Sequence, residues 1–174
     1  MKKQKGFSLI ELLIVVAIIL IIAAIAIPNL LRSKIAANES SGVGSVRTIG
    51  TAEVTYSSAW GTGYAVDLPS LGGAVPCTAA ATSACLIDPL LSVAPNTKSG
   101  YVFNAAGTLL TNGINNGFEV NATPSVVGTT GQRAFCDDQT GVIKFQVSGA
   151  AIGVGAGSCS GLATAAGVSG PIGN

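Results

Sequence analysis

The sequence predicts an α+β protein, in which a long N-terminal helix precedes a C-terminal antiparallel sheet of about four strands. From Phe7 to Ile27 there are 21 residues, and only Ser8 and Glu11 among them are polar. At a rise of roughly 1.5 Å per residue this helix would be about 30 Å long, which matches one hydrocarbon core. From Gly100 the chain changes to short runs rich in aromatic and β-branched residues, which are typical of strands. A chain of 174 residues is expected to form one domain plus the apolar anchor.

The apolar segment, residues 7–28, is expected to cross a membrane as a helix. Three of the five residues before Gly6 are lysines, which favours a cytoplasmic N-terminus with the polar remainder outside. Glu11 is the anomaly, because a charge inside an apolar span costs roughly 2.5–3.5 kcal/mol on insertion scales, and less near the interface. If the chain were cut after Gly6, the new α-ammonium group on Phe7 would lie one helical turn from Glu11. The alternative is that Glu11 sits at the headgroup level without a role.

Residues 29–59 are expected to continue the helix as an amphipathic half. Pro28 removes one helical N–H and clashes with the preceding turn. We expect a kink there and not an end, because apolar residues recur at three- and four-residue steps after it. The apolar positions Val43, Val46, Ile49 and Val54 are expected to face the sheet, and the charged positions Arg32, Lys34, Glu39, Arg47 and Glu53 mostly to face away. The helix is expected to stop near Ser57–Trp60, before two glycines.

The remainder divides by composition into three parts. Residues 60–99 contain many Pro and Gly residues and are expected to form a connecting αβ-loop, with one short helix around Asp88–Val93. Residues 100–147 are expected to form the sheet, with strands in the runs GYVFNAA, GFEVNAT, QRAFCD and GVIKFQV and a turn at 137–141. Residues 148–174 hold eight glycines in 27 positions and are expected to be irregular, tied down only by Cys159.

The stretch KGFSLIELLIVVAIILIIAAIAIPNL resembles the N-terminus of type IV prepilins and of type II secretion pseudopilins. Their pattern is a short basic leader, a glycine, a methylatable phenylalanine and a glutamate five residues into the mature chain. These residues stand here as Gly6, Phe7 and Glu11, and Pro28 also matches. The resemblance is most specific over residues 5–35 and weaker to about Tyr64, and GTTGQRAFCDDQTGVIKF looks like the last hairpin of some bacterial pilins. It implies the type IV pilin fold, removal of residues 1–6 as a prepilin leader peptide, and N-methylation of Phe7.

The same resemblance implies a function. The chain would be a structural subunit of a type IV pilus, a homo-oligomeric filament used for adhesion, twitching motility or DNA uptake. Its partners would be a prepilin peptidase/methyltransferase and the inner-membrane pilus assembly machinery. It would lie in the bacterial inner membrane, single-pass with its N-terminus cytoplasmic, before assembly, and in the extracellular filament afterwards. The alternative is a pseudopilin of a type II secretion system or a minor pilin. An ordinary secretory signal, with Ala24-Ile25-Ala26 as its cleavage site, competes with this interpretation, but the apolar run is long for one and Glu11 interrupts its start.

The four cysteines, Cys77, Cys85, Cys136 and Cys159, form no C-x-x-C pair, and the chain has no histidine, so a zinc site is poorly supported. An even count beyond a membrane anchor favours two disulfides in an oxidising compartment over free buried thiols. Three connectivities are possible. We favour the local pairing, Cys77–Cys85 and Cys136–Cys159, and the second pair resembles the C-terminal disulfide loop of many type IV pilins.

Composition and motifs argue against several other functions. Charged residues make up 10% of the chain, against about 25% in ordinary soluble proteins, which suits a subunit buried among its copies or a low-complexity secreted protein. Residues 7–174 carry six Lys/Arg against eight Asp/Glu, so no basic surface supports primary nucleic-acid binding. Without histidine or a G-x-S-x-G elbow we expect no enzyme, and we expect no cofactor. Asp137 and Asp138 are weak calcium candidates, since oxygen ligands cluster in turns and the resembling pseudopilins bind calcium near the C-terminus.

Overall fold

The computed structural model describes residues 7–73, 75–165 and 167–172. The chain forms two compact units, residues 1–34 and residues 35–174. Helix α1 (Leu9–Trp60) supplies the N-terminal unit with its first half and the globular unit with its second half. The helix continues through Pro28, so this proline does not end it; a bend there stays a prediction.

In the globular unit, α1 packs one face against the sheet. Val46 and Ile49 are fully buried, Ala52 and Tyr56 are nearly so, and Val43 lies partly buried against the same core. The sheet contributes apolar side chains to the same core: Tyr101, Phe103, Phe118, Val120, Ala122 and Phe135. The predicted assignment of helix residues to the sheet side or the solvent side is wrong at three positions, because Val54 is exposed whereas Glu39 and Glu53 are buried. Both carboxylates accept hydrogen bonds from backbone N–H groups that lie beyond the helix, which is what permits their burial.

The sheet has six antiparallel strands, not the four expected, and each strand pairs with its neighbours in chain order. The strands are β1 (Thr97–Lys98), β2 (Tyr101–Thr111), β3 (Ile114–Pro124), β4 (Ala134–Asp138), β5 (Lys144–Gln146) and β6 (Ser169–Pro171). Strands β2 to β5 correspond to the four predicted runs. The two additional strands, β1 and β6, are only two and three residues long, too short for alternation to reveal them.

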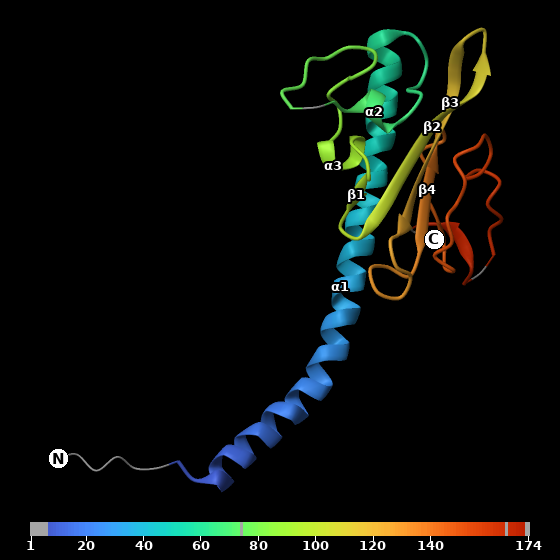
Figure 1. Ribbon diagram of the computed structural model, residues 1–174. Coiled ribbons are helices and arrows are strands. Elements are labelled where there is room, and N and C mark those ends of the chain that lie inside the picture. Colours follow the sequence, from blue (N-terminus) through green and yellow to red (C-terminus); the bar gives the residue numbers. More distant parts are fainter. Residues whose placement is uncertain (1–6, 74, 166, 173–174) are drawn as a thin grey trace. The chain divides into compact units, whose positions relative to one another are not determined.

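The long hairpin of β2 and β3 dominates the sheet (Figure 1). Its two-residue turn is Asn112–Gly113, and both residues have positive φ, 53° and 81°. Positive φ at both central positions is the type I′ requirement, and Asn-Gly is the sequence that meets it most readily. This turn holds the register that places Tyr101 opposite Pro124 and Thr111 opposite Ile114.

The connection between α1 and the sheet contains two single-turn helices. Helix α3 (Pro89–Ser92) lies inside the predicted short helix, with Asp88 as its N-cap and Pro89 at its start. Helix α2 (Leu68–Leu71) was not expected, although Asp67 caps it in the same way by accepting the Ser70 N–H. Their buried leucines join the main core. The connection is therefore anchored to the globular unit by capped turns.

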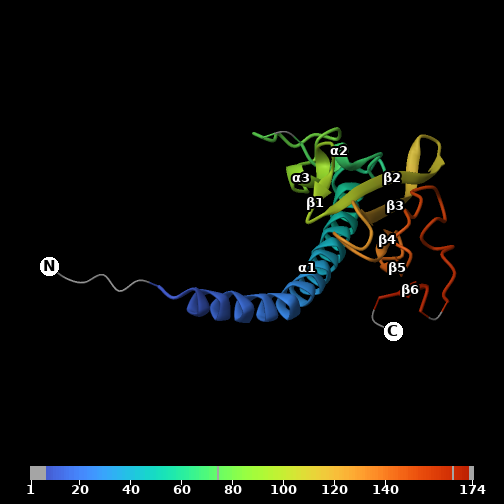
Figure 2. The ribbon, with the colours of Figure 1, turned by 60° about the horizontal axis from the view of Figure 1, so that its bottom comes forward.

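The Gly-rich tail covers the face of the sheet opposite α1, as both ribbon views show (Figures 1 and 2). A second, smaller core of Ala134, Cys136, Ile152 and Cys159 lies there. The Lys144 ammonium group donates to the Ser160 carbonyl at 2.7 Å, and β6 pairs with β5. The expectation that Cys159 alone ties the tail is therefore wrong.

Candidate functional site

Glu11 caps the N-terminal end of α1 by accepting a backbone N–H at Ser8. The Ser8 N–H donates to Glu11 Oε2 at 3.0 Å, and the Leu12 N–H donates to the Ser8 carbonyl at 3.2 Å. A glutamate at the third helical position that reaches back to the N-cap N–H is half of a capping box. The S-x-x-E spacing is the sequence signal for this contact, and it is a second signal at Glu11 beside the charge. Phe7 lies outside the helix, and Gly6 lies outside the described residues.

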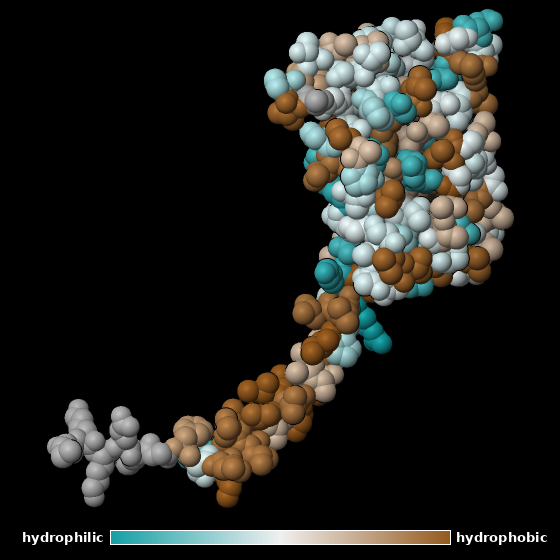
Figure 3. Space-filling model, in the orientation of Figure 1, coloured by the Kyte–Doolittle hydropathy of each residue, from teal (hydrophilic) through white to brown (hydrophobic). Residues whose placement is uncertain are grey.

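The first half of α1 presents apolar side chains on all sides. Seventeen large apolar residues between Phe7 and Leu31 are each at least 45% exposed. Figure 3 shows this surface as almost continuously hydrophobic. Within the described part of the chain, α1 is the one helix long and apolar enough to cross a membrane. Exposed apolar surface on this scale marks contact with lipid or with other protein chains.

Glu39 connects α1 to the loop before β4. Its Oε1 accepts the backbone N–H groups of Gln132 and Arg133 at 2.9 and 3.1 Å, and its Oε2 accepts the Arg133 Nε and Nη2 at 2.9 and 2.7 Å. The Arg133 guanidinium also lies 5.5 Å from the ring centroids of Phe135 and Phe145. Four hydrogen bonds satisfy this carboxylate, so the group stabilises the fold and has no free lone pair directed at a ligand.

Glu53 is the second carboxylate that α1 buries. It is fully buried, its Oε2 accepts the Ala65 N–H at 2.8 Å, and its Oε1 has no hydrogen-bond partner in the part of the chain that is described. Burial raises the Glu53 pKa to about 8, against the lowering effect of the Ala65 hydrogen bond, and the nearby negative charge of Asp67 adds to the rise. Glu53 is therefore mostly protonated at neutral pH.

The two disulfides are the local pairs, Cys77–Cys85 and Cys136–Cys159. They differ in environment, because Cys136 and Cys159 are fully buried whereas Cys77 and Cys85 are exposed. The buried pair lies beside Glu119, whose carboxylate accepts backbone N–H groups from the tail.

The two calcium candidates, Asp137 and Asp138, do not converge. They are the last two residues of β4, and successive strand residues point to opposite faces. Asp137 faces α1, where a Cβ on Gly50 would come within 2.7 Å of its Oδ2, and burial raises the Asp137 pKa to about 6. Asp138 pairs across the strands with Glu119 and accepts the Thr140 N–H at 2.8 Å.

Asp138, Glu119 and Cys159 also bring possible metal-ligating atoms within 4.8 Å of one another. However, the Cys159 sulfur is bonded to Cys136, and both Glu119 oxygens accept backbone N–H groups. Asp138 Oδ1 likewise accepts the Thr140 N–H and hydroxyl, so both carboxylates are already engaged by hydrogen bonds within the described residues. This geometry does not support a metal site, and calcium binding stays a prediction.

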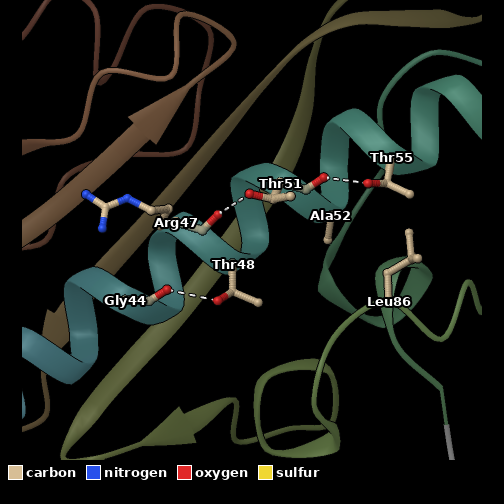
Figure 4. A pocket seen from close by; sticks show the side chains of 7 residues that line it. All are labelled: Gly44, Arg47, Thr48, Thr51, Ala52, Thr55 and Leu86. Carbon is tan, nitrogen blue, oxygen red and sulfur yellow. Dashed lines mark hydrogen bonds between the residues drawn. The ribbon is translucent and has the colours of Figure 1, made fainter.

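A groove of about 380 Å³ lies along the exposed face of the second half of α1 (Figure 4). Thr48, Thr51 and Thr55 line it, and each hydroxyl donates to a helix carbonyl four residues earlier at 2.9 Å. Arg47 is the one charged residue lining the groove. The groove brings together no nucleophile and general base, which is the arrangement that hydrolytic chemistry needs.

Comparison with known proteins places its matches at the N-terminal end. Residues 1–27 match the family described as prokaryotic N-terminal methylation motif. The chain is 60% identical over 40 residues to the type IV wide pilus major component PilA4 of Thermus thermophilus, which is 23% of this chain and 30% of that protein. It is 43% identical over 54 residues to the type IV major pilin protein PilA of Myxococcus xanthus, which is 31% of this chain and 24% of that protein. No solved structure matches.

The chain thus spans less than a third of the length of these curated relatives in the matched region. Within that region the matches support the type IV pilin interpretation of the N-terminal sequence. The α+β architecture, a long N-terminal helix followed by an antiparallel sheet, agrees with the predicted fold class.

Proposed function

We propose that this chain is a structural subunit of a type IV pilus, which polymerises through the first half of α1. The observation that carries the proposal is the exposed apolar helix that begins within two residues of Phe7, inside the methylation motif. Fully burying one Leu, Ile or Phe side chain is worth about 1.5–3 kcal/mol, so seventeen exposed large apolar residues strongly favour leaving water. Lipid covers them before assembly, and the same segments of neighbouring copies cover them in the filament.

Maturation follows from the same motif. A prepilin peptidase/methyltransferase would cut between Gly6 and Phe7 on the cytoplasmic side of the bacterial inner membrane and methylate the new N-terminus. The cut removes three lysines and creates an α-ammonium group one residue before Ser8. Glu11, whose carboxylate already reaches back to the Ser8 N–H, lies within one turn of that group. The pilus assembly machinery would then extract the subunit into an extracellular filament.

Glu11 is proposed to select the register of neighbouring subunits. Burying a lone ammonium group among apolar helices is very costly, and a carboxylate of the same or an adjacent subunit removes that cost. Breaking such a buried pair by removing one partner typically costs about 3–5 kcal/mol. Apolar contacts add adhesion without direction, so the charge pair is the contact that specifies position.

Two variants of Glu11 test this role. Glu11→Ala removes both the charge and the acceptor for the Ser8 N–H, whereas Glu11→Gln keeps an acceptor in the same place and removes only the charge. We expect both variants to be inserted and cleaved, and neither to form filaments without wild-type subunits. Cleavage is followed by mass spectrometry and filaments by electron microscopy of sheared material. Normal filaments from Glu11→Gln subunits alone would show that assembly does not need the charge. Normal filaments from Glu11→Ala subunits alone would show that assembly needs neither the charge nor the capping bond.

Analysis of sheared surface filaments also distinguishes a major pilin from a minor pilin or a type II pseudopilin. Identification of this chain as the main component of long surface filaments supports a major pilin. If it were found only in trace amounts, a minor pilin would fit better. If cells without the chain lost protein secretion but kept their surface filaments, a type II pseudopilin would be favoured. Adhesion, twitching motility and DNA uptake are then assigned by comparing each activity in cells with and without the chain.

A further inference from the structure

Two buried polar side chains of β3 hold the Gly-rich tail on the outer face of the sheet. Glu119 and Asn121 are 1% and 4% exposed, and they alternate with Phe118, Val120 and Ala122, which face the α1 core. Asn121 lies opposite Cys136 in the strand register, and Glu119 lies opposite Asp138. Because alternate strand residues share a face, both side chains project from the face of the sheet that the tail covers.

Both residues contact the tail segment that carries Cys159, and Asn121 Oδ1 also accepts the Asn104 Nδ2 of β2 at 3.2 Å. Glu119 Oε1 accepts the Gly157 N–H at 2.8 Å, and Glu119 Oε2 accepts the Cys159 N–H at 2.9 Å. The Asn121 side-chain amide donates to the Ile152 carbonyl. No lysine or arginine forms an ion pair with Glu119 in the ranges that the structure describes, so backbone N–H groups supply its compensation for burial. A buried carboxylate without a cation is costly, so these N–H groups are what keep Glu119 in place.

None of these contacts involves sulfur. They are therefore available to the reduced chain, in which the tail would otherwise be a Gly-rich segment with little to order it. Four reduced cysteines allow three pairings, and Cys136 and Cys159 are 23 positions apart in the sequence. We propose that Glu119 is a positioning residue for oxidation: it sets Cys159 over Cys136 before the disulfide forms, and so accelerates and selects that pairing.

The chemistry is thiol–disulfide exchange with a disulfide oxidant. One cysteine thiolate attacks a sulfur of the oxidant and forms a mixed disulfide, which releases one oxidant thiol. The second cysteine thiolate then displaces the other oxidant sulfur and closes Cys136–Cys159. Two cysteine thiols are oxidised, one oxidant disulfide is reduced to two thiols, and Glu119 takes no part in electron transfer. Its effect is on the proximity of the two cysteine sulfurs.

The test uses the full chain in detergent micelles, reduced and then returned to a buffer of oxidised and reduced glutathione. Samples are quenched with acid, alkylated and mapped by mass spectrometry, so that each disulfide has its own rate and equilibrium. Cys77–Cys85 serves as an internal reference, since it makes no contact with Glu119. For Glu119→Leu we expect the effective concentration of the Cys136–Cys159 thiols to fall at least about tenfold, since a hydrogen bond to a charged group contributes on that order. The rate and equilibrium of Cys77–Cys85 should be unchanged. Disulfides that join Cys77 or Cys85 to Cys136 or Cys159 should increase.

Two further variants distinguish a specific effect on the Cys136–Cys159 disulfide from a general loss of folding. Glu119→Gln keeps the shape and one good acceptor, and should give a smaller loss confined to the same disulfide. Glu39→Gln alters another buried glutamate that accepts two backbone N–H groups, and should leave the ratio of the two disulfides unchanged. In concentrated guanidinium all variants should be alike. An equal fall in both disulfides of Glu119→Gln, or no fall in Cys136–Cys159 for either Glu119 variant, would overturn the proposal.

Discussion

Glu53→Gln should remove a pH dependence of folding stability that the wild-type chain shows between about pH 5 and pH 8, the interval set by the Glu53 pKa. Glutamine has the shape of a protonated glutamate, and its carbonyl oxygen can accept the Ala65 N–H as Glu53 Oε2 does at 2.8 Å. Its NH₂ group then takes the place of Oε1, which has no partner among the described residues. The variant thus imitates the neutral side chain and differs from it mainly in being unable to ionise.

The sign and size follow from the two pKa values. The Glu53 pKa is 4.5 in the unfolded reference and about 8 in the folded chain. Between these values the folded chain binds more protons than the unfolded chain, so the free energy of unfolding falls as pH rises. The contribution is fully present below pH 4.5 and is lost as pH rises through 8. At about 1.4 kcal/mol per pH unit, wild type should lose on the order of 3 kcal/mol between about pH 5 and pH 8 relative to Glu53→Gln.

Guanidinium unfolding of the full chain in micelles measures this difference. Trp60 is the only tryptophan, and it stacks on Tyr56 at the end of α1, so its fluorescence reports on this region. The raised pKa values of Asp137 and Glu119 shift stability in the same direction, but both groups are present in wild type and variant and cancel in the comparison. Glu11→Gln, the same substitution in the first turn of α1, is the control and should follow wild type. Parallel stability curves for wild type and Glu53→Gln across this range would refute the reasoning.

Three other outcomes are expected. Gly6→Val should accumulate as uncleaved precursor on immunoblots, because a side chain obstructs backbone access at the cut; normal processing would contradict the assigned site. The exposed Cys77–Cys85 disulfide should be reduced by a phosphine before the buried Cys136–Cys159 pair, as followed by alkylation and peptide mapping, and simultaneous reduction would contradict the difference in burial. Glu39→Ala should cost on the order of 3 kcal/mol of unfolding free energy, measured by guanidinium unfolding, because it leaves the Arg133 guanidinium and two N–H groups without an acceptor, whereas Glu39→Gln should cost less.

The parts of the fold that follow from local pattern were predictable. The helix follows from three- and four-residue spacing, strands β2 to β5 follow from aromatic and β-branched runs, and α3 follows from Asp88-Pro89. Strands β1 and β6 have no such pattern, since they exist only because β2 and β5 offer unpaired backbone groups beside them. The contact between the Ser8 N–H and Glu11, half of a capping box, is equally local and follows from the S-x-x-E spacing.

The buried carboxylates could not be placed from the sequence. Helical periodicity assigns Glu39 and Glu53 to the solvent side because it treats charge as a marker of exposure. Their actual positions depend on N–H groups at residues 132, 133 and 65, which only the completed fold brings near. Glu119 is similar, since its N–H donors belong to a segment that composition alone describes as irregular.

The short outer strands of the sheet have a consequence for how copies of this chain can associate. β1 has two residues, and β6 has three and ends in Pro171, which has no backbone N–H. These two edge strands offer almost no ladder to an approaching strand, which disfavours growth by strand addition, the usual start of amyloid-like aggregation, at β1 and β6. The segment proposed to polymerise is instead a helix, whose backbone groups are already paired and whose apolar surface lipid can cover. If the chain polymerises as proposed, copies are therefore expected to associate through helix contacts and not through β1 or β6.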